Sequence, residues 1–180
     1  MKRNIGTTAL LGALAAGSAL AQETDTLIAQ AVVALPEQLR EDATVVRDTA
    51  PGERKVLREG TNGIICRADS PGPGFRVDCF HPSTDAMLQR YFALLEAGTP
   101  SAEVPVMLDA DVKAGKFRVP AGAADYILMG QSFEDAVPLM TVMTPGGTTE
   151  STGLLTDPSF TLPWLMWAGT GVAHVMIPGK

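Results

Sequence analysis

Residues 63–81 read GIICRADSPGPGFRVDCFH and contain both cysteines of the chain. The run SPGPG at 70–74 predicts a turn, because proline fixes φ and glycine permits a positive φ. If the turn is centred between Gly72 and Pro73, Cys66 falls directly opposite Cys79. Opposed residues of an antiparallel pair lie close enough for a disulfide. We therefore predict a β-hairpin closed by a Cys66–Cys79 bond.

The same register separates the side chains of the hairpin by face, because successive residues of a strand point to opposite sides. Arg67 falls opposite Asp78 and Asp69 opposite Arg76, which gives a polar face with two pairs of opposite charge. The apolar face carries Ile64, Cys66, Ala68, Val77 and Cys79. A slip of one residue would mix the two sets, so the pattern favours this register.

The N-terminus has the pattern of a secretory signal peptide. A short basic start, Met1-Lys2-Arg3, precedes an apolar, uncharged stretch at 8–20 and the small-x-small pattern Ala19-Leu20-Ala21. We predict a signal peptide at 1–21 and a single α+β domain at 22–180. Export to the periplasm or the outside of the cell favours the disulfide, because these compartments are oxidising.

Charge narrows the classes of partner. After cleavage, 12 basic residues (Lys2 and Arg3 are lost from 14) and 20 acidic residues give a net charge of −8. An acidic chain argues against binding to nucleic acid or to anionic membranes. No segment after the signal peptide has the length and hydropathy of a transmembrane helix. A small ligand or a protein partner remains as the expectation.

Hydrophobic periodicity predicts the other elements. Helices are expected at 25–35, 84–97 and 102–114, where apolar residues recur at helical spacing. Strands are expected at 44–46, 55–58, 116–119, 125–129, 138–143 and 171–177, with one helical turn at 132–136 and a long irregular loop at 144–163. With the hairpin, the first strands predict a four-strand antiparallel β-meander, and two or three helices are expected to cover one face of the sheet. Arg58 would oppose Arg67 across a tight turn, so a longer loop is expected between them.

The two histidines of the chain, His81 and His174, are candidate metal ligands. His174 and Met176 are two residues apart in a predicted strand and so share a face, and imidazole and thioether suit copper. Possible further ligands are His81, Met140, Met143 and Met166. The alternative is that His174 is an ordinary hydrogen-bonded core residue and that the methionines fill gaps.

Two tryptophans, Trp164 and Trp167, adjoin the long loop. At this spacing they could share a helical face and line an apolar ligand pocket together with His174. Large aromatic residues more often belong to the core, with the indole N–H bonded to a carbonyl. This stretch is nevertheless the best candidate for a ligand or partner surface.

Catalytic motifs are incomplete. The run Gly130-Gln131-Ser132 lacks the final glycine of a nucleophile elbow. A hydroxyl of Ser151 or Thr152 in the 144–163 loop, with His174 as base, would give a hydrolase, but no spacing requires this arrangement. The sequence therefore favours an exported, non-enzymatic binding or interaction domain, with a copper or other soft-metal protein and a hydrolase as the alternatives.

Overall fold

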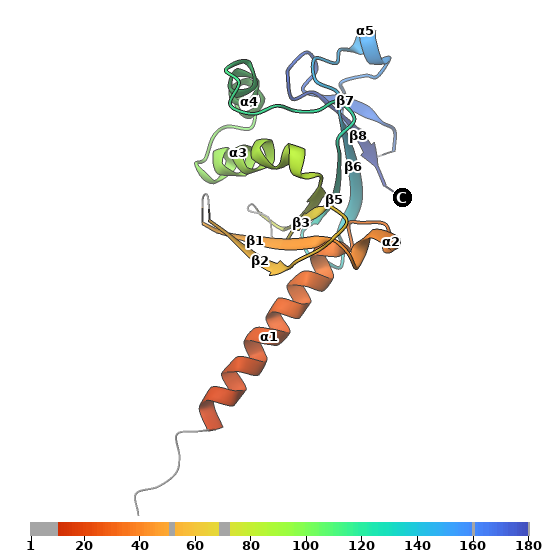
Figure 1. Ribbon diagram of the computed structural model, residues 1–180. Coiled ribbons are helices and arrows are strands. Elements are labelled where there is room, and N and C mark those ends of the chain that lie inside the picture. The colour runs from red at the N-terminus through yellow and green to blue at the C-terminus, as the bar shows by residue number, and fades with distance from the viewer. Residues whose placement is uncertain (1–10, 51–52, 69–72, 160, 180) are drawn as a thin grey trace, which may run out of the picture.

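A computed structural model of the protein describes residues 11–50, 53–68, 73–159 and 161–179. Within these residues, eight strands form one mixed sheet in the order β2-β1-β3-β4-β5-β6-β8-β7 (Figure 1). The strands are β1 (Thr44–Ala50), β2 (Glu53–Arg58), β3 (Ile65–Arg67), β4 (Phe75–Phe80), β5 (Ala124–Gly130), β6 (Val137–Met143), β7 (Trp164–Met166) and β8 (His174–Pro178). The helices are α1 (Leu11–Val32), α2 (Glu37–Arg40), α3 (Asp85–Glu96), α4 (Val104–Lys113) and α5 (Thr149–Thr152), and a 3-10 turn, η1 (Pro82–Thr84), precedes α3. The predicted α+β class is confirmed.

The hairpin of β3 and β4 has the predicted register. Cys66 pairs with Cys79 and Arg67 with Asp78, and a disulfide joins the two cysteines across a Cα separation of 4.0 Å. The other predicted pair includes Asp69, which lies outside the described residues. The predicted disulfide and its place in the sheet are therefore confirmed.

The first strands do not form the predicted antiparallel meander. Strand β2 pairs with β1 at the sheet edge, and β3 lies on the other side of β1 and runs parallel to it. A long loop does follow Arg58, but it returns to the start of β1, where Thr44 N donates to Ile64 O. Gly60 is required in this loop, because a Cβ there would collide with the backbone of Ala43 and Thr44. From β3 to β6 the strands are antiparallel neighbours in chain order.

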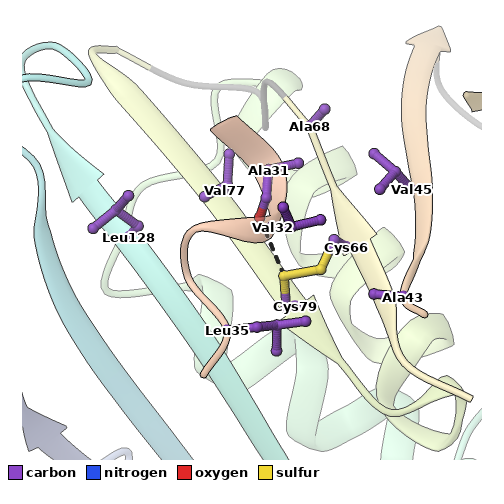
Figure 2. Close-up of a cluster of buried hydrophobic side chains, with 10 residues drawn as sticks. All are labelled: Ala31, Val32, Leu35, Ala43, Val45, Cys66, Ala68, Val77, Cys79 and Leu128. Carbon is purple, nitrogen blue, oxygen red and sulfur yellow. Dashed lines mark hydrogen bonds between the residues drawn. A yellow bond between two sulfur atoms is a disulfide. The ribbon is translucent and has the colours of Figure 1, made fainter. Parts of the chain in front are cut away.

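Helices cover both faces of the sheet, whereas the sequence predicted one covered face. The C-terminal end of α1 packs on the disulfide side, where Sγ of Cys79 lies 3.3 Å from Ala31 O (Figure 2). Phe80, the next residue of β4, belongs to a second buried cluster with residues of α3 and α4. The reason is that both faces of this hairpin are buried, so each face needs its own cover.

A network of charged side chains links the start of α3 to strands β1, β2 and β3. Arg54 of β2 bonds Asp48 of β1 and both carboxylate oxygens of Asp85, the first residue of α3. The fully buried Arg67 lies 2.7 Å from Asp48 Oδ2 and stacks on the Phe92 ring, 4.4 Å from its centroid. This network ties the start of α3 to the first three strands of the sheet.

Three local predictions were wrong. Residues 116–119 form no strand, and Val119 instead packs among the helices in the second cluster. Residues 132–136 form bends and turns rather than a helical turn. Trp164 begins strand β7 and Trp167 follows this strand, so the two tryptophans do not share a helical face. Pro163 and Gly169 flank the stretch and leave it too short for a helix.

Candidate functional site

A cavity of about 260 Å³ lies between α3 and the helix-facing side of strands β4 to β8. Alternation places every second residue of each strand on this side, so each strand contributes a short row of side chains. The sheet supplies Arg76, Asp125, Ile127, Met129, Leu139, Thr141, Met143, Met166, His174 and Met176, and α3 supplies Met87, Leu88 and Tyr91. The lining is mainly apolar with a few polar groups, which is the usual composition of a small-molecule site.

A second, larger pocket of about 640 Å³ adjoins this cavity. The two share five lining residues, which are Arg76, Tyr91, Met129, Leu139 and Met176. Trp164, Phe92 and Leu95 add apolar surface to the larger pocket. Because five side chains line both, the two hollows adjoin along α3, and together they are called the groove below.

Arg76 lines both hollows and carries a positive charge, and Asp78 of the same strand is its ion-pair partner. The Arg76 guanidinium donates to both carboxylate oxygens of Asp78, with a shortest distance of 2.6 Å. Burial opposes the charge on Arg76, but the Asp78 carboxylate outweighs it and raises the pKa of the guanidinium. The same guanidinium lies 5.3 Å from the Phe92 ring centroid and 5.7 Å from that of Tyr91. The Asp78 carboxylate and the two aromatic rings thus hold the Arg76 guanidinium in place.

Asp125 is a buried acid in the same wall. Only 6% of the residue is exposed, and its Oδ1 has no hydrogen-bond partner. Burial and the neighbouring Asp78 carboxylate raise the pKa of Asp125 well above its ordinary value, although Arg76 and Arg67 act in the opposite direction. A buried polar atom without a partner is costly, so Asp125 presents an unmet hydrogen-bonding group to the cavity.

His174 is buried at the other end of the cavity. Its Nδ1 lies 2.9 Å from Val172 O, and since a carbonyl oxygen can only accept, Nδ1 carries the proton. Burial lowers the pKa of the imidazole, so the ring is neutral and Nε2 keeps its lone pair. The ring meets Trp167 edge-on, with 5.0 Å between centroids.

Trp167 has a strained backbone. Its φ of 56° is the only positive value at a non-glycine residue in the part of the chain that the structure describes. A bulky side chain in this left-handed region costs about 1–3 kcal/mol, and such outliers cluster at functional sites. The turn after Trp167 is held by α4, because Gly171 N donates to Asp109 Oδ1 at 2.7 Å. Trp167 also contacts Tyr91 of α3, with 6.0 Å between ring centroids.

The structure gathers most of the residues that the sequence singled out. Trp167, His174 and Met176 line the smaller cavity, and Trp164 lines the larger pocket. Met143 and Met166 line the smaller cavity as well. Met140 does not join them, because it pairs with Ile177 and therefore points to the other face of the sheet.

His81 lies apart from His174. It is exposed, and its Nδ1 accepts from Ser83 N at the start of η1. His81 follows β4, and His174 belongs to β8, which is three strands further along the sheet. At roughly 4.8 Å per strand this separation is about 14 Å, too far for both to bind one ion.

The hydroxyl groups considered for a hydrolase serve another purpose. The Ser151 hydroxyl accepts from Thr148 N and donates to Thr148 O, and the Thr152 hydroxyl also donates to Thr148 O. These bonds cap α5, and neither residue is among those that line the two pockets. The hydrolase alternative therefore gains no support from this geometry.

Sequence reasoning missed Arg76, Asp125 and Tyr91 as parts of the site. Arg76 was expected on a polar face of the hairpin, and Asp125 was read only as the start of a strand. Tyr91 was assigned to the apolar stripe of its helix. The alternation of Arg and Asp in the hairpin was a usable signal, because charged residues on a covered face must pair or line a cavity.

No protein-family model matches the chain, and neither a curated protein nor a solved structure matches it. Over the described residues, no three His, Cys, Asp or Glu side chains gather in a way that could hold a metal ion. No described helix has the length and apolar character needed to cross a membrane.

Proposed function

We propose that the protein is an exported, non-enzymatic binding domain that holds a small, mainly apolar ligand between α3 and the sheet. The observation that carries this proposal is the apolar groove formed by the cavity of about 260 Å³ and the adjoining pocket of about 640 Å³. Ligand sites typically have this size and are lined by hydrophobic and aromatic side chains.

The polar groups of the groove indicate the chemistry of the ligand. Asp125 presents a carboxyl oxygen without a partner, and its raised pKa favours the neutral acid. Arg76 is already bonded to Asp78, so it does not supply an unpaired positive charge. A neutral ligand with an apolar body and one hydroxyl, amine or amide group fits this arrangement best, because it would satisfy Asp125 without burying a new charge.

Export to the periplasm or outside is part of the proposal. The signal-peptide pattern at 1–21 supports it, and so does the disulfide. Leu27, Ile28 and Ala31 of α1 pack in the core cluster on the disulfide side, and all three lie beyond the expected cleavage after Ala21. Cleavage would therefore leave the packed end of α1 in the mature protein.

The test uses residues 22–180 and the fluorescent probe 1-aminoanthracene, which has an apolar ring system and one amine. We expect saturable binding with an increase in fluorescence. Leu139 lines both pockets, so Leu139→Trp should fill their junction and weaken binding about tenfold or more. Val106→Trp is the matched control, because Val106 is exposed on α4 and lines neither pocket.

Circular dichroism of each variant shows whether the fold is kept. Absence of saturable binding, or equal binding by the wild-type protein and a folded Leu139→Trp variant, would contradict the ligand site. The non-enzymatic part is tested with a generic ester and a generic peptide substrate. Turnover that disappears in His174→Ala would overturn it.

A further inference from the structure

We propose that His174, Met143, Met166 and Met176 form a binding site for a soft monovalent metal ion, Cu(I), on the cavity wall made by β6, β8 and β7. This inference does not rest on the proposed apolar ligand, because it concerns the thioether and imidazole atoms of the wall and not the volume of the groove.

Strand register brings these four side chains together. His174 of β8 pairs with Met143 of β6 on one side and with Met166 of β7 on the other. Directly opposed residues have Cβ atoms about 4.5–5.5 Å apart, and Met176 follows two residues later on the same face. All four line the same cavity, so their side chains project into a shared space.

The imidazole is prepared to act as a ligand. Its Nδ1–H is held by Val172 O, which leaves Nε2 as the only ring nitrogen with a lone pair. Metal-binding histidines usually have this arrangement, in which the second nitrogen donates to a backbone carbonyl and fixes the ring.

The ligand set selects the type of metal. Thioether and imidazole groups are soft or intermediate ligands without charge, and thioethers favour Cu(I) over hard divalent ions. A monovalent ion also costs less to bury among neutral ligands than a divalent one. The oxygen-rich or histidine-rich clusters that hold other common ions are not formed by the described residues.

The neighbouring charges permit a cation at this place. Arg76 acts on His174 electrostatically, but Asp78 is bonded to it and offsets its charge. The Trp167 ring packs perpendicular to the imidazole, with 5.0 Å between ring centroids, and shields one side of it.

The methionines of the cavity also have an ordinary interpretation as gap fillers. Five of the eight methionines in the chain line this cavity, so their presence alone does not distinguish a ligand from a filler. Met129 provides the distinction, because it lines the cavity but belongs to β5 and pairs with Arg76, near the far end of the strand from His174. If the metal site exists, Met166→Leu should weaken Cu(I) binding and Met129→Leu should not. If the methionines only fill gaps, the two variants should behave alike.

The experiment measures Cu(I) binding by residues 22–180 in competition with a coloured Cu(I) chelator, bicinchoninate, under ascorbate, which leaves disulfides intact. We expect one Cu(I) per chain. Met143→Leu, Met166→Leu and His174→Phe should each weaken binding about tenfold or more, since they remove ligands but keep apolar volume. Met129→Leu and His81→Ala should bind as the wild-type protein does. X-ray absorption of the loaded protein should show sulfur and nitrogen neighbours.

Three results would overturn the site: no competition by the wild-type protein, wild-type affinity in Met166→Leu and His174→Phe, or an equal loss in Met129→Leu. If His174→Phe does not fold, the Met143→Leu/Met166→Leu double variant gives the same decision. Measuring both ligands on the wild-type protein separates the two proposals. Binding of Cu(I) without saturable binding of 1-aminoanthracene isolates the metal site, and the reverse pattern isolates the apolar ligand.

Discussion

Asp78 of β4 and Asp125 of β5 are buried carboxyl groups on the same face of the sheet and on neighbouring strands. The register pairs Asp78 with Ile127 and Phe80 with Asp125, so the two acids are diagonal neighbours. Arg76 bonds Asp78, whereas Oδ1 of Asp125 has no hydrogen-bond partner. Two buried acids this close cannot both ionise freely, and Asp125 is the one whose pKa rises.

Asp125→Asn should flatten the dependence of stability on pH. Because the folded pKa of Asp125 lies above its ordinary value of 3.8, the folded state holds a proton that the unfolded state releases. The free energy of unfolding should therefore fall as pH rises above that ordinary value and through the folded pKa. Asparagine removes this penalty at similar volume, so the variant should be at least as stable as the wild-type protein at neutral pH.

Urea unfolding at a series of pH values checks this expectation. Glu41→Gln is the control, because Glu41 is exposed and lines neither hollow of the groove. A variant whose stability declines with rising pH as steeply as the wild-type protein would show that Asp125 is not the responsible group.

Removal of the disulfide should destabilise the protein strongly. The bond joins residues 13 positions apart in sequence, and closing a loop of this length contributes about 3 kcal/mol in the chain-entropy model. The Cys66→Ala/Cys79→Ala double variant should lose roughly that much free energy of unfolding in urea. Both thiols found free by mass spectrometry in exported protein would remove the basis of this prediction.

Arg67→Ala should be among the most damaging substitutions of a charged residue. The side chain is fully buried beside Asp48 and against Phe92, so its loss removes one of the two arginines bound to Asp48 and opens a cavity. Breaking a buried ion pair in this way costs about 3–5 kcal/mol. Arg118→Ala is the matched control, because Arg118 is exposed and its loss should change stability by only about 0.5 kcal/mol or less. If Arg67→Ala and Arg118→Ala lower the free energy of unfolding equally, in both thermal and urea unfolding, the burial of Arg67 does not add to stability.

Export should yield a chain that begins at Gln22. The basic start, the apolar stretch and Ala19-Leu20-Ala21 favour cleavage after Ala21. Intact-mass measurement of protein recovered from the periplasm or medium should give the mass of residues 22–180 with one disulfide. Recovery of the chain with Met1 still attached would contradict this prediction.

Local patterns in the sequence were sufficient for the β3–β4 hairpin and for α3 and α4, whereas the helix expected at 25–35 is the end of a longer helix, α1 (Leu11–Val32). Alternation of side chains set Cys66 opposite Cys79, because a slip of one residue would mix the apolar and polar sets. The same reasoning put His174 and Met176 on one face of β8. Helical spacing located α3 and α4 to within a few residues.

Strand order and the partners of β8 were decided only by the packing of distant segments. Val45 and Val46 of β1 are both buried, because β1 is an inner strand covered on both faces, and their short apolar run could not reveal a parallel partner. Met143 and Met166 flank His174 because β6 and β7 pair with β8, which no spacing along the chain shows. Register follows from neighbouring residues, whereas the choice among sheet topologies depends on burying both faces of the sheet at once. That balance includes the buried polar side chains of Arg67 and Asp125, whose surroundings exist only in the folded chain.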